Sequence, residues 1–447
     1  MKMKKWTALL LVFSLLTLLT ACSNQNNRYY GDKPSNGTLR VCVDSWYTDP
    51  ALDKDREYHS RLFFEALAQE IKSACGIEKL TFEILPCDSA ERETALQRRR
   101  TEIMAGEGPD VFIMQSVTSL MDGVQHRDAL FNFPEKNMES GIFLPLDEYM
   151  SNTQFTDWNA QTKAVMDAGR NDEGQLIVPM TYKLPVLIYP KSEADIARSA
   201  ELTMQDILDD PKTAQLGAAL YSSLNKTDSY NVRALNDMCL TAVLGQLADY
   251  EQEELLFTAE ELSETLNTML SLHDATEANP LQYIKTFTSY SFLIYDLYTL
   301  STDTEMTLVP LYSTDGGVTA TITAYAAVNR NTAYPEKAFS VIDYIMQEKT
   351  QRESELYTEY FNDGLPMQND LGSEEKTLWA TMNPQRFLEE PYFKDLLSIK
   401  EEITAVNFMS EFDIILEGLA FDSVFDDSFS DETISEAYEK MERMVGE

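Results

Sequence analysis

A run of four apolar residues, Val111-Phe112-Ile113-Met114, constrains the fold of this chain more than any other feature. A strand without a polar position offers no face to water, so both of its faces must be covered. Strands of that kind occur in parallel sheets flanked by helices. The segments before this run alternate between strand-like and helix-like patterns, which is the order expected of an α/β domain.

The spacing of apolar residues predicts the helices and strands in the first part of the chain. Gly76 is expected to end the first helix, since glycine is the usual residue after a helix. The residues expected on the buried face of that helix are Leu62, Phe63, Ala66, Leu67, Ile71 and Ala74. The expected strands are 39–43, 80–84 and 111–114, and the expected helices are about 60–75 and 89–104.

The later elements fit the same class. Two strands are expected within 175–190 and a third at 319–328. A helix at 258–272 should bury Leu262, Leu266, Met269 and Leu270, and a helix at 336–352 should bury Ala338, Phe339, Ile342, Ile345 and Met346. Ser430, followed by two acids, is a good N-cap for a last helix.

The N-terminus has the parts of an export signal. Lysines without acids precede an apolar run that ends at Thr20 and is shorter than the ~20 residues of a membrane-spanning helix. Leu19-Thr20-Ala21-Cys22 resembles the bacterial lipobox, which implies cleavage of a signal peptide at 1–21 and a lipid on Cys22. The polar segment 22–37 is expected to be a flexible tether. The alternative is an ordinary secreted protein with a chance cysteine here.

Composition excludes several classes of partner. With 44% hydrophobic and 11% aromatic residues, the chain is globular and long enough for two domains of ~100–200 residues each. The formal net charge is −38, and removal of a signal with three lysines makes it −41. Such a charge repels nucleic-acid phosphates and anionic lipid headgroups, so nucleic acid is not an expected partner.

The positions of the cysteines and histidines limit which metal sites and disulfides the chain can form. The histidines stand in no metal-ligand spacing and there is no CxxC, so no metal and no cofactor is predicted. Cys75 ends a predicted helix and Cys87 follows the next strand, which leaves a disulfide open in an extracellular protein. Buried thiols are the other interpretation, and we favour it.

Several short motifs follow one another in a fixed order after the tether. They are Gly108-Pro109-Asp110-Val111, Leu144-Pro145-Leu146-Asp147-Glu148-Tyr149, Gly174 to Lys191, Asn329 to Gln351, and Gly364-Leu365-Pro366. Together they resemble the extracellular solute-binding proteins of ABC importers, of the maltose- and sugar-binding type. Two positions depart from that pattern, because Pro190 replaces an asparagine and Tyr290 stands near a missing glycine.

The resemblance implies an α/β fold of the two-lobed, periplasmic-binding-protein-like kind (type II), with lobes joined by several hinge crossings. Lobe one would be 38–178 and 312–362, and lobe two 182–310 and 365–447. Several hinge strands let rigid lobes close over a ligand. The implied function is capture of a small solute, a carbohydrate, for the permease subunits of an ABC importer. The protein would be a monomer without enzymatic activity, anchored by its lipid to the extracellular face of the cell membrane.

Candidate ligand-binding residues lie just past strand ends, where the clefts of α/β proteins form. Aromatic faces and polar groups suit sugars, whose hydroxyls must be paired when buried. The candidates are Asp44, Trp46, Tyr47, Gln115, Ser116, Tyr182, Lys183, Tyr298 and Asp413. Tyr182 and Trp46 are expected to matter more for binding than for folding. The competing interpretation of each candidate is packing or an ordinary surface position.

Two other functions stay open. A surface hydrolase acting on glycans would need a nucleophile with its base, or a metal cluster, and the sequence has no GxSxG, HExxH or Gly-rich phosphate loop. A pair of carboxylates could serve a glycosidase, but a chance pair is expected in a chain with 74 acidic residues, so it does not support that function. An adhesin or other non-transport binding lipoprotein could share the fold. The motifs do not specify the ligand.

Overall fold

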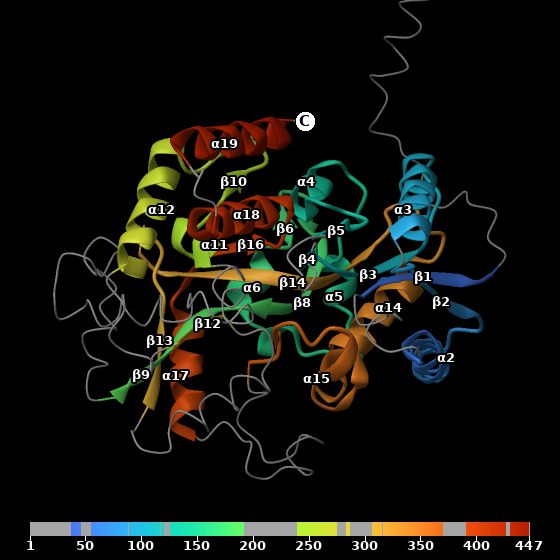
Figure 1. The fold of residues 1–447 in the computed structure, drawn as a ribbon. Helices are drawn as coiled ribbons and strands as arrows, with labels where there is room; N and C mark the ends of the chain where they lie inside the picture. Colours follow the sequence, from blue (N-terminus) through green and yellow to red (C-terminus); the bar gives the residue numbers. More distant parts are fainter. Residues whose placement is uncertain are drawn as a thin grey trace, which may run out of the picture.

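Strand β14 (Val318–Val328) runs through the middle of the molecule and every one of its residues is buried (Figure 1). Residues 324–328 pair antiparallel with β3 (Val111–Gln115), and residues 318–322 pair parallel with β16 (Ile403–Phe408). The other edge of β14 pairs antiparallel with β8 (Ile177–Lys183). One strand therefore joins three segments that are far apart in the sequence.

The structure is a computed structural model. It describes residues 37–45, 55–87, 89–116, 118–119, 126–191, 239–274, 283–286, 306–314, 316–369, 390–425 and 430–446.

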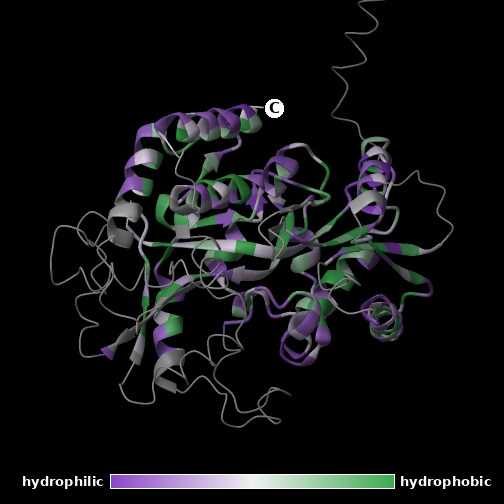
Figure 2. Ribbon diagram, in the orientation of Figure 1, coloured by the Kyte–Doolittle hydropathy of each residue, from purple (hydrophilic) through white to green (hydrophobic). Residues whose placement is uncertain are grey.

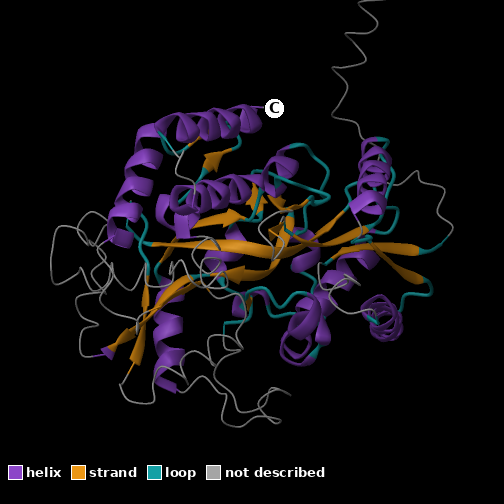
Figure 3. Cartoon of the chain, in the orientation of Figure 1, coloured by secondary structure: helices purple, strands orange, loops and turns teal. Residues whose placement is uncertain are grey.

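The main sheet has seven strands in the order β15-β8-β14-β3-β1-β2, with β16 also paired to β14. Strand β1 (Leu39–Asp44) lies parallel to both β2 (Leu80–Ile84) and β3, and β15 (Leu365–Pro366) lies at the other edge. The expected parallel strand is confirmed, since the side chains of Val111 to Met114 are at most 1% exposed. Helices cover both faces of this part of the sheet (Figure 3).

The flanking helices begin and end close to the predicted positions. Helix α3 (Ser89–Met104) lies on one side of the sheet, and α2 (Arg56–Cys75) and α14 (Pro335–Met346) lie on the other (Figure 1). Gly76 has the left-handed conformation, with φ of 64°, and its N–H bonds the carbonyl of Lys72, so the predicted helix end is confirmed.

The buried face of α2 differs from the predicted one. The structure buries Ser60, Phe64, Leu67, Ala68 and Ile71, whereas Leu62 is 44% exposed and Ala66 and Ala74 are also exposed. Both rings of the aromatic pair Phe63-Phe64 pack on Tyr360, but only Phe64 also packs on Phe82 of β2, and this contact selects the face that is buried.

The single helix expected at 336–352 is two helices. Helix α14 ends at Met346, and α15 (Glu348–Glu353) begins after Gln347, whose ψ of 148° is extended. The Gln347 amide and the Thr350 hydroxyl both donate to the carbonyl of Tyr344, which stabilises the break. The apolar positions predicted for this helix are all buried.

Four helices enclose a second hydrophobic core: α11 (Cys239–Leu244), α12 (Ala259–Asp274), α18 (Glu411–Phe425) and α19 (Asp431–Gly446). Leu262 and Leu266 of α12 are buried as predicted, and α19 starts directly after Ser430. Figure 2 shows α18 as mostly hydrophobic, in keeping with its central place in this core. The first core surrounds the main sheet.

A smaller sheet has β9 (Pro185–Pro190) between β12 (Tyr283–Thr286) and β13 (Met306–Pro310), all antiparallel. Helix α17 (Glu390–Glu401) packs on β13. The short elements are β4 (Thr118–Ser119), β5 (His126–Arg127), α4 (Pro134–Glu139), α5 (Asp147–Met150), a 3-10 helix (Trp158–Ala160), α6 (Lys163–Asp167), β6 (Arg170–Asn171), β7 (Gly174–Gln175), β10 (Ala248–Asp249), β11 (Glu254–Leu255) and a π-helix (Leu356–Tyr360).

Cys75 and Cys87 form no disulfide in the structure. The Sγ of Cys75 lies 3.5 Å from the carbonyl oxygen of Ser340, and that of Cys87 lies 3.8 Å from the carbonyl oxygen of Ser45. Burial raises the pKa of the Cys75 thiol to about 11.

Candidate functional site

Helix α4 connects the two cores. The ring of Phe133, directly before the helix, lies 5.0 Å from Phe412 and 6.3 Å from Tyr250, both in the region of the second core. The Nζ of Lys136 donates to the carbonyls of Met444 and Val445 at the end of α19. Met138 on the same helix is part of the first core. A six-residue helix therefore touches both halves of the molecule.

Glu135 occupies the centre of this contact. Its Oε1 accepts the backbone N–H of Phe408 over 2.9 Å, and its Oε2 is buried without a hydrogen-bond partner among the described residues. The pKa of the Glu135 carboxyl is raised to about 7, mainly by burial and to a smaller extent by the negative charge of Asp413, against the lowering effect of the Phe408 N–H. The carboxyl is therefore half-protonated near neutral pH.

Asp413 lies in the first turn of α18 and is 5% exposed. Its Oδ1 accepts the hydroxyl of Thr241 over 2.9 Å, and its Oδ2 accepts the backbone N–H of Ser410 over 2.7 Å. Burial raises the pKa of Asp413 to about 6, although these hydrogen bonds and the charge of Lys183 lower it. The Ser410 contact has the form of a capping box, so Asp413 also stabilises the start of α18.

Two tyrosines complete the group. The Tyr325 hydroxyl on β14 is buried without a partner among the described residues, and its ring packs edge-on against Phe408 with centroids 5.6 Å apart. The Tyr250 hydroxyl bonds Ser410. Burial raises the pKa of both phenols, and the charge of Glu135 acts on both. We call Glu135, Tyr250, Tyr325 and Asp413 the junction cluster.

Three predicted residues lie at the ends of β1 and β3, next to β14. The Asp44 carboxylate is 2% exposed and receives both terminal nitrogens of Arg92, over 3.0 and 2.7 Å, and its charge acts on Tyr325. Gln115 lies opposite Ala324 in the sheet and is 4% exposed. The Ser116 hydroxyl donates to the carbonyl of Ile322.

Lys183 ends β8 and is 2% exposed. Its Nζ lies 3.1 Å from Oδ1 of Asp363, and its charge also acts on Asp413. The structure therefore brings Asp44, Gln115, Ser116, Lys183 and Asp413 to the region where β14 passes from the first core towards the second.

Tyr182 has a different place from the one expected. It is fully buried in the first core, and its hydroxyl bonds the Thr162 hydroxyl over 3.1 Å. Burial raises the pKa of its phenol well above the usual range. Every residue of β8 is buried, and the hydroxyl of Tyr182 already bonds Thr162, so the structure shows this side chain packed in the core. Trp46, Tyr47, Tyr298, Tyr290 and Cys22 lie outside the described residues.

Sequence reasoning missed three members of the junction cluster. Tyr325 had a signal, since it is the one large polar side chain in a strand of small and β-branched residues. Glu135 and Tyr250 had none, because both stand in short polar segments that look like surface loops. Glu135 is buried where α4 meets β16 of the main sheet, and Tyr250 is buried where it meets Phe133 beside the second core.

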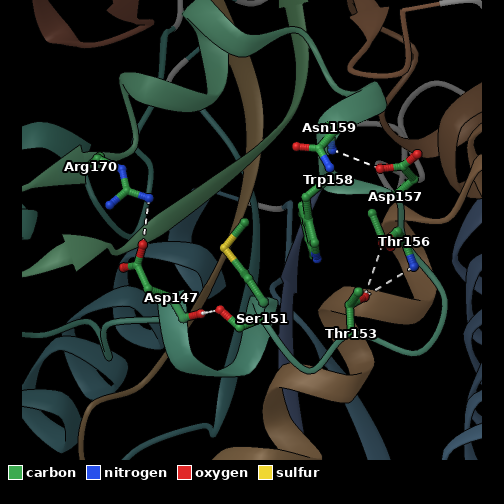
Figure 4. Close-up of a pocket in the computed structure, with 9 residues that line it drawn as sticks. Asp147, Ser151, Thr153, Thr156, Asp157, Trp158, Asn159 and Arg170 are labelled. Carbon is green, nitrogen blue, oxygen red and sulfur yellow. Dashed lines mark hydrogen bonds and ion pairs between the residues drawn. The ribbon is translucent and has the colours of Figure 1, made fainter.

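A separate cavity of about 410 Å³ opens beside α5, the 3-10 helix and β6 (Figure 4). Asp147 on its wall bonds Arg170 over 2.6 Å and the Gln175 backbone N–H over 2.7 Å. The Trp158 ring on the opposite wall packs near Phe339. None of the residues that line the cavity is a predicted site residue, and it does not border the junction cluster.

Two kinds of feature are absent from the residues that the structure describes. These residues contain no group of three or more His, Cys, Asp or Glu side chains that could hold a metal ion. None of their helices is both long and apolar enough to cross a membrane.

No protein-family model matches the chain, and neither does any curated protein. Solved structures do match over almost its whole length. An extracellular solute-binding protein of family 1 from Alicyclobacillus acidocaldarius has a TM-score of 0.54 at 12% identity, covering 93% of this chain and 100% of its own. A periplasmic solute-binding protein from Pectobacterium atrosepticum has a TM-score of 0.52 at 12% identity, covering 92% and 98%.

A cyclic α-maltosyl-1,6-maltose binding protein from Arthrobacter globiformis has a TM-score of 0.50 at 13% identity, covering 91% of this chain and 99% of its own. These likenesses show the fold. The predicted α/β fold of the periplasmic solute-binding proteins, with two lobes, is confirmed.

Proposed function

We propose that this protein captures a small solute, a carbohydrate, between its two lobes and delivers it to the permease subunits of an ABC importer. The observation that carries the proposal is the junction cluster. A fold built to close over ligands has, where its two cores meet, buried acceptor and donor atoms without partners among the described residues. Such atoms cost about 1–3 kcal/mol each when unpaired, so a ligand with hydroxyls would stabilise them.

The chemistry of the cluster favours a ligand rich in hydrogen-bond donors. Glu135 and Asp413 are acceptors when ionised, and the phenol of Tyr325 both donates and accepts. Among the described residues the two buried cations of this region are already paired, Arg92 with Asp44 and Lys183 with Asp363, whereas neither Glu135 nor Asp413 forms an ion pair with a cation. An anionic solute would therefore meet like charge. A neutral sugar supplies hydroxyl donors and C–H faces for the aromatic rings.

The proposed site combines predicted and newly found residues. For Asp44, Gln115, Ser116, Lys183 and Asp413 we propose the ligand-binding role expected from the sequence, and we add Glu135, Tyr250 and Tyr325 to them. Trp46, Tyr47 and Tyr298 stay predictions from the sequence. The proposed lobes have the bounds predicted from the sequence. Lobe one comprises 38–178 and 312–362, and lobe two comprises 182–310 and 365–447.

The proposed location follows from the N-terminal sequence. Residues 1–21 would be cleaved, Cys22 would carry the lipid, and 22–37 would tether the folded body to the extracellular face of the membrane. A tethered monomer beside its permease needs no further anchor.

A solute screen tests the proposal. Mono-, di- and oligosaccharides are added to the purified protein, with peptides and polyamines as controls, and the melting temperature is measured. A ligand that binds only the folded protein raises stability by about RT ln(1 + [L]/Kd). A shift with one class of sugar is expected. A shift with peptides alone would overturn the carbohydrate assignment, and turnover of a glycoside would favour a hydrolase.

A matched pair of variants then tests the site. Tyr325→Phe removes a hydroxyl that has no partner among the described residues, so unliganded stability should hold while the sugar-induced shift falls. Tyr357→Phe is the control, because this buried tyrosine bonds only the sulfur of Met346 among the contacts described, within the first core. Equal sugar-induced shifts in the two variants would remove Tyr325 from the site.

A further inference from the structure

The cavity in Figure 4 has walls that hydrogen bonds fix in place. On one wall the Asp147 carboxylate accepts the Gln175 backbone N–H over 2.7 Å and bonds Arg170 over 2.6 Å. This carboxylate fits only because residue 174 is glycine, since a Cβ on Gly174 would lie 2.0 Å from Oδ2 of Asp147. The wall is therefore formed before any ligand arrives.

The opposite wall is a turn that is equally well fixed. The carboxylate of Asp343 accepts the backbone N–H groups of residues 154–156. Asp157 then begins the 3-10 helix, and its Oδ1 accepts the Asn159 N–H over 3.0 Å. Walls that are ordered in advance lower the entropy that a ligand must lose on binding, so the cavity is suited to hold one.

Trp158 contributes an aromatic ring to the cavity (Figure 4). The ring packs near Phe339, with centroids 6.1 Å apart, and the indole Nε1 is buried without a hydrogen-bond partner among the described residues. Packing, and not a hydrogen bond, therefore holds this ring in place. The thioether of Met150 also lines the cavity. The two side chains together offer apolar surface to the C–H groups of a ligand.

The polar groups beside Trp158 indicate the chemistry of that ligand. The side chains of Asp157 and Asn159 are exposed, and neither the Asn159 amide nor Oδ2 of Asp157 has a hydrogen-bond partner among the described residues. The cavity has two carboxylates, and its one cation, Arg170, already pairs with Asp147. An anion would therefore meet net negative charge. An aromatic face next to a carboxylate and an amide suits a neutral ligand that has both C–H faces and hydroxyls.

We propose that this cavity is a second carbohydrate site, in which one sugar ring stacks on Trp158 and its hydroxyls bond Asp157 and Asn159. The cavity volume of about 410 Å³ lies within the range of ~300–1,000 Å³ found for small-molecule sites. The cavity shares no residue with the junction cluster. The second site therefore does not depend on which solute the protein captures between its lobes.

Tryptophan indole signals test the second site. The purified protein, labelled with ¹⁵N-tryptophan, is titrated with the methyl α-glycosides of glucose, galactose and mannose, and the indole N–H resonances are followed by NMR. The Trp158 resonance, assigned by its absence in Trp158→Phe, is expected to shift in a saturable way with at least one glycoside. No shift with any of these glycosides overturns the proposal. An equal shift with N-acetyl-lysine methylamide would show a site for cations and would overturn it as well.

Two asparagine variants separate the cavity from the rest of its loop. Asn159→Ala removes an exposed amide, so it should keep the fold and raise the Kd of the glycoside about three- to tenfold, which corresponds to one lost hydrogen bond. Asn152→Ala is the control, because this exposed amide bonds the Glu148 carbonyl and does not line the cavity, and it should keep the wild-type Kd. An unchanged Kd in Asn159→Ala, or an equal rise in both variants, overturns the second site.

A variant of the junction cluster keeps the two sites apart. Tyr325→Phe should leave the glycoside-induced shift of the Trp158 resonance as it is in the wild type, because Tyr325 does not line the cavity. Loss of that shift in Tyr325→Phe would mean that the resonance reports binding between the lobes, and it would overturn the second site. The sugar screen of the interlobe site is judged by Tyr325 alone, so either proposal can fail without the other.

Discussion

The Nζ of Lys183 lies 3.1 Å from Oδ1 of Asp363, and this ion pair fastens the end of β8 to the segment that leads into β15. The lysine side chain is 2% exposed and that of Asp363 is 16% exposed. Removal of one partner from a buried ion pair costs about 3–5 kcal/mol. The pair is therefore a structural element of the crossing as well as a neighbour of Asp413.

Asp363→Asn is expected to lower the free energy of unfolding by about 3–5 kcal/mol. Asp167→Asn is the control, because Asp167 pairs with Lys163 at the surface and exposed pairs contribute at most about 1 kcal/mol. Urea unfolding at neutral pH measures both. Similar losses in the two variants would show that Lys183 does not depend on Asp363.

Tyr182→Ala should destabilise the protein by about 3–5 kcal/mol, because it removes a fully buried aromatic side chain. Tyr182→Phe loses only the hydrogen bond to Thr162 and should cost roughly 0.5–1.5 kcal/mol. Denaturant unfolding without ligand gives both values. If Tyr182→Ala instead melted like the wild type and lost its response to sugar, the original placement of Tyr182 in the cleft would be restored.

Asp343 holds the loop on one side of the cavity in Figure 4. Its carboxylate accepts the backbone N–H groups of Gln154, Phe155 and Thr156, over 2.7, 3.2 and 3.0 Å. Asp343→Asn places an NH₂ donor against these donors, so each unpaired group should cost roughly 1–3 kcal/mol.

Hydrogen exchange of residues 154–156, together with thermal unfolding, checks this expectation. Asp157→Asn serves as the control, since Asp157 is exposed and bonds only the Asn159 N–H among the contacts of its side chain described here. Faster exchange in both variants would indicate a loop that is loose for reasons other than Asp343.

Cys22→Ala is expected to release the protein from the membrane fraction or to stall its processing, because the thiol that receives the lipid is gone. Fractionation and immunoblotting of cells that express the full chain measure the outcome. Ser23→Ala, next to the cysteine, should behave as the wild type. A Cys22→Ala protein that is processed normally and stays with the membrane would contradict the lipid anchor.

The fold was largely predictable because its signals are local. The apolar run at Val111, the period of 89–104 and the glycine at Gly76 each act within a few residues, and each is confirmed. Tertiary contacts decided the exceptions. The helical face around Phe64 depended on its contact with Phe82 of strand β2. The break at Gln347 depended on side chains that donate to the Tyr344 carbonyl.

The site was predictable only in part. Residues after strand ends, such as Asp44 and Gln115, follow from the geometry of α/β sheets. The complete burial of Tyr182 could not be predicted, because β8 is buried on both faces and no alternation in the sequence marks one of them. Glu135 was missed because the residues around it come from α4, β16 and α18, which are far apart in the sequence. The local sequence Pro134-Glu135-Lys136 does not indicate that a carboxyl is buried there.

The pairing of β14 also has a consequence for the order in which the chain can fold. A nascent chain that ends before Val318 has β3 and β8 but lacks the strand that lies between them, so their facing edges stay unpaired. The parallel partner β16 is made later still, at Ile403. Contacts between residues so distant in sequence slow folding. Most of the polypeptide is therefore synthesised before its central sheet can close.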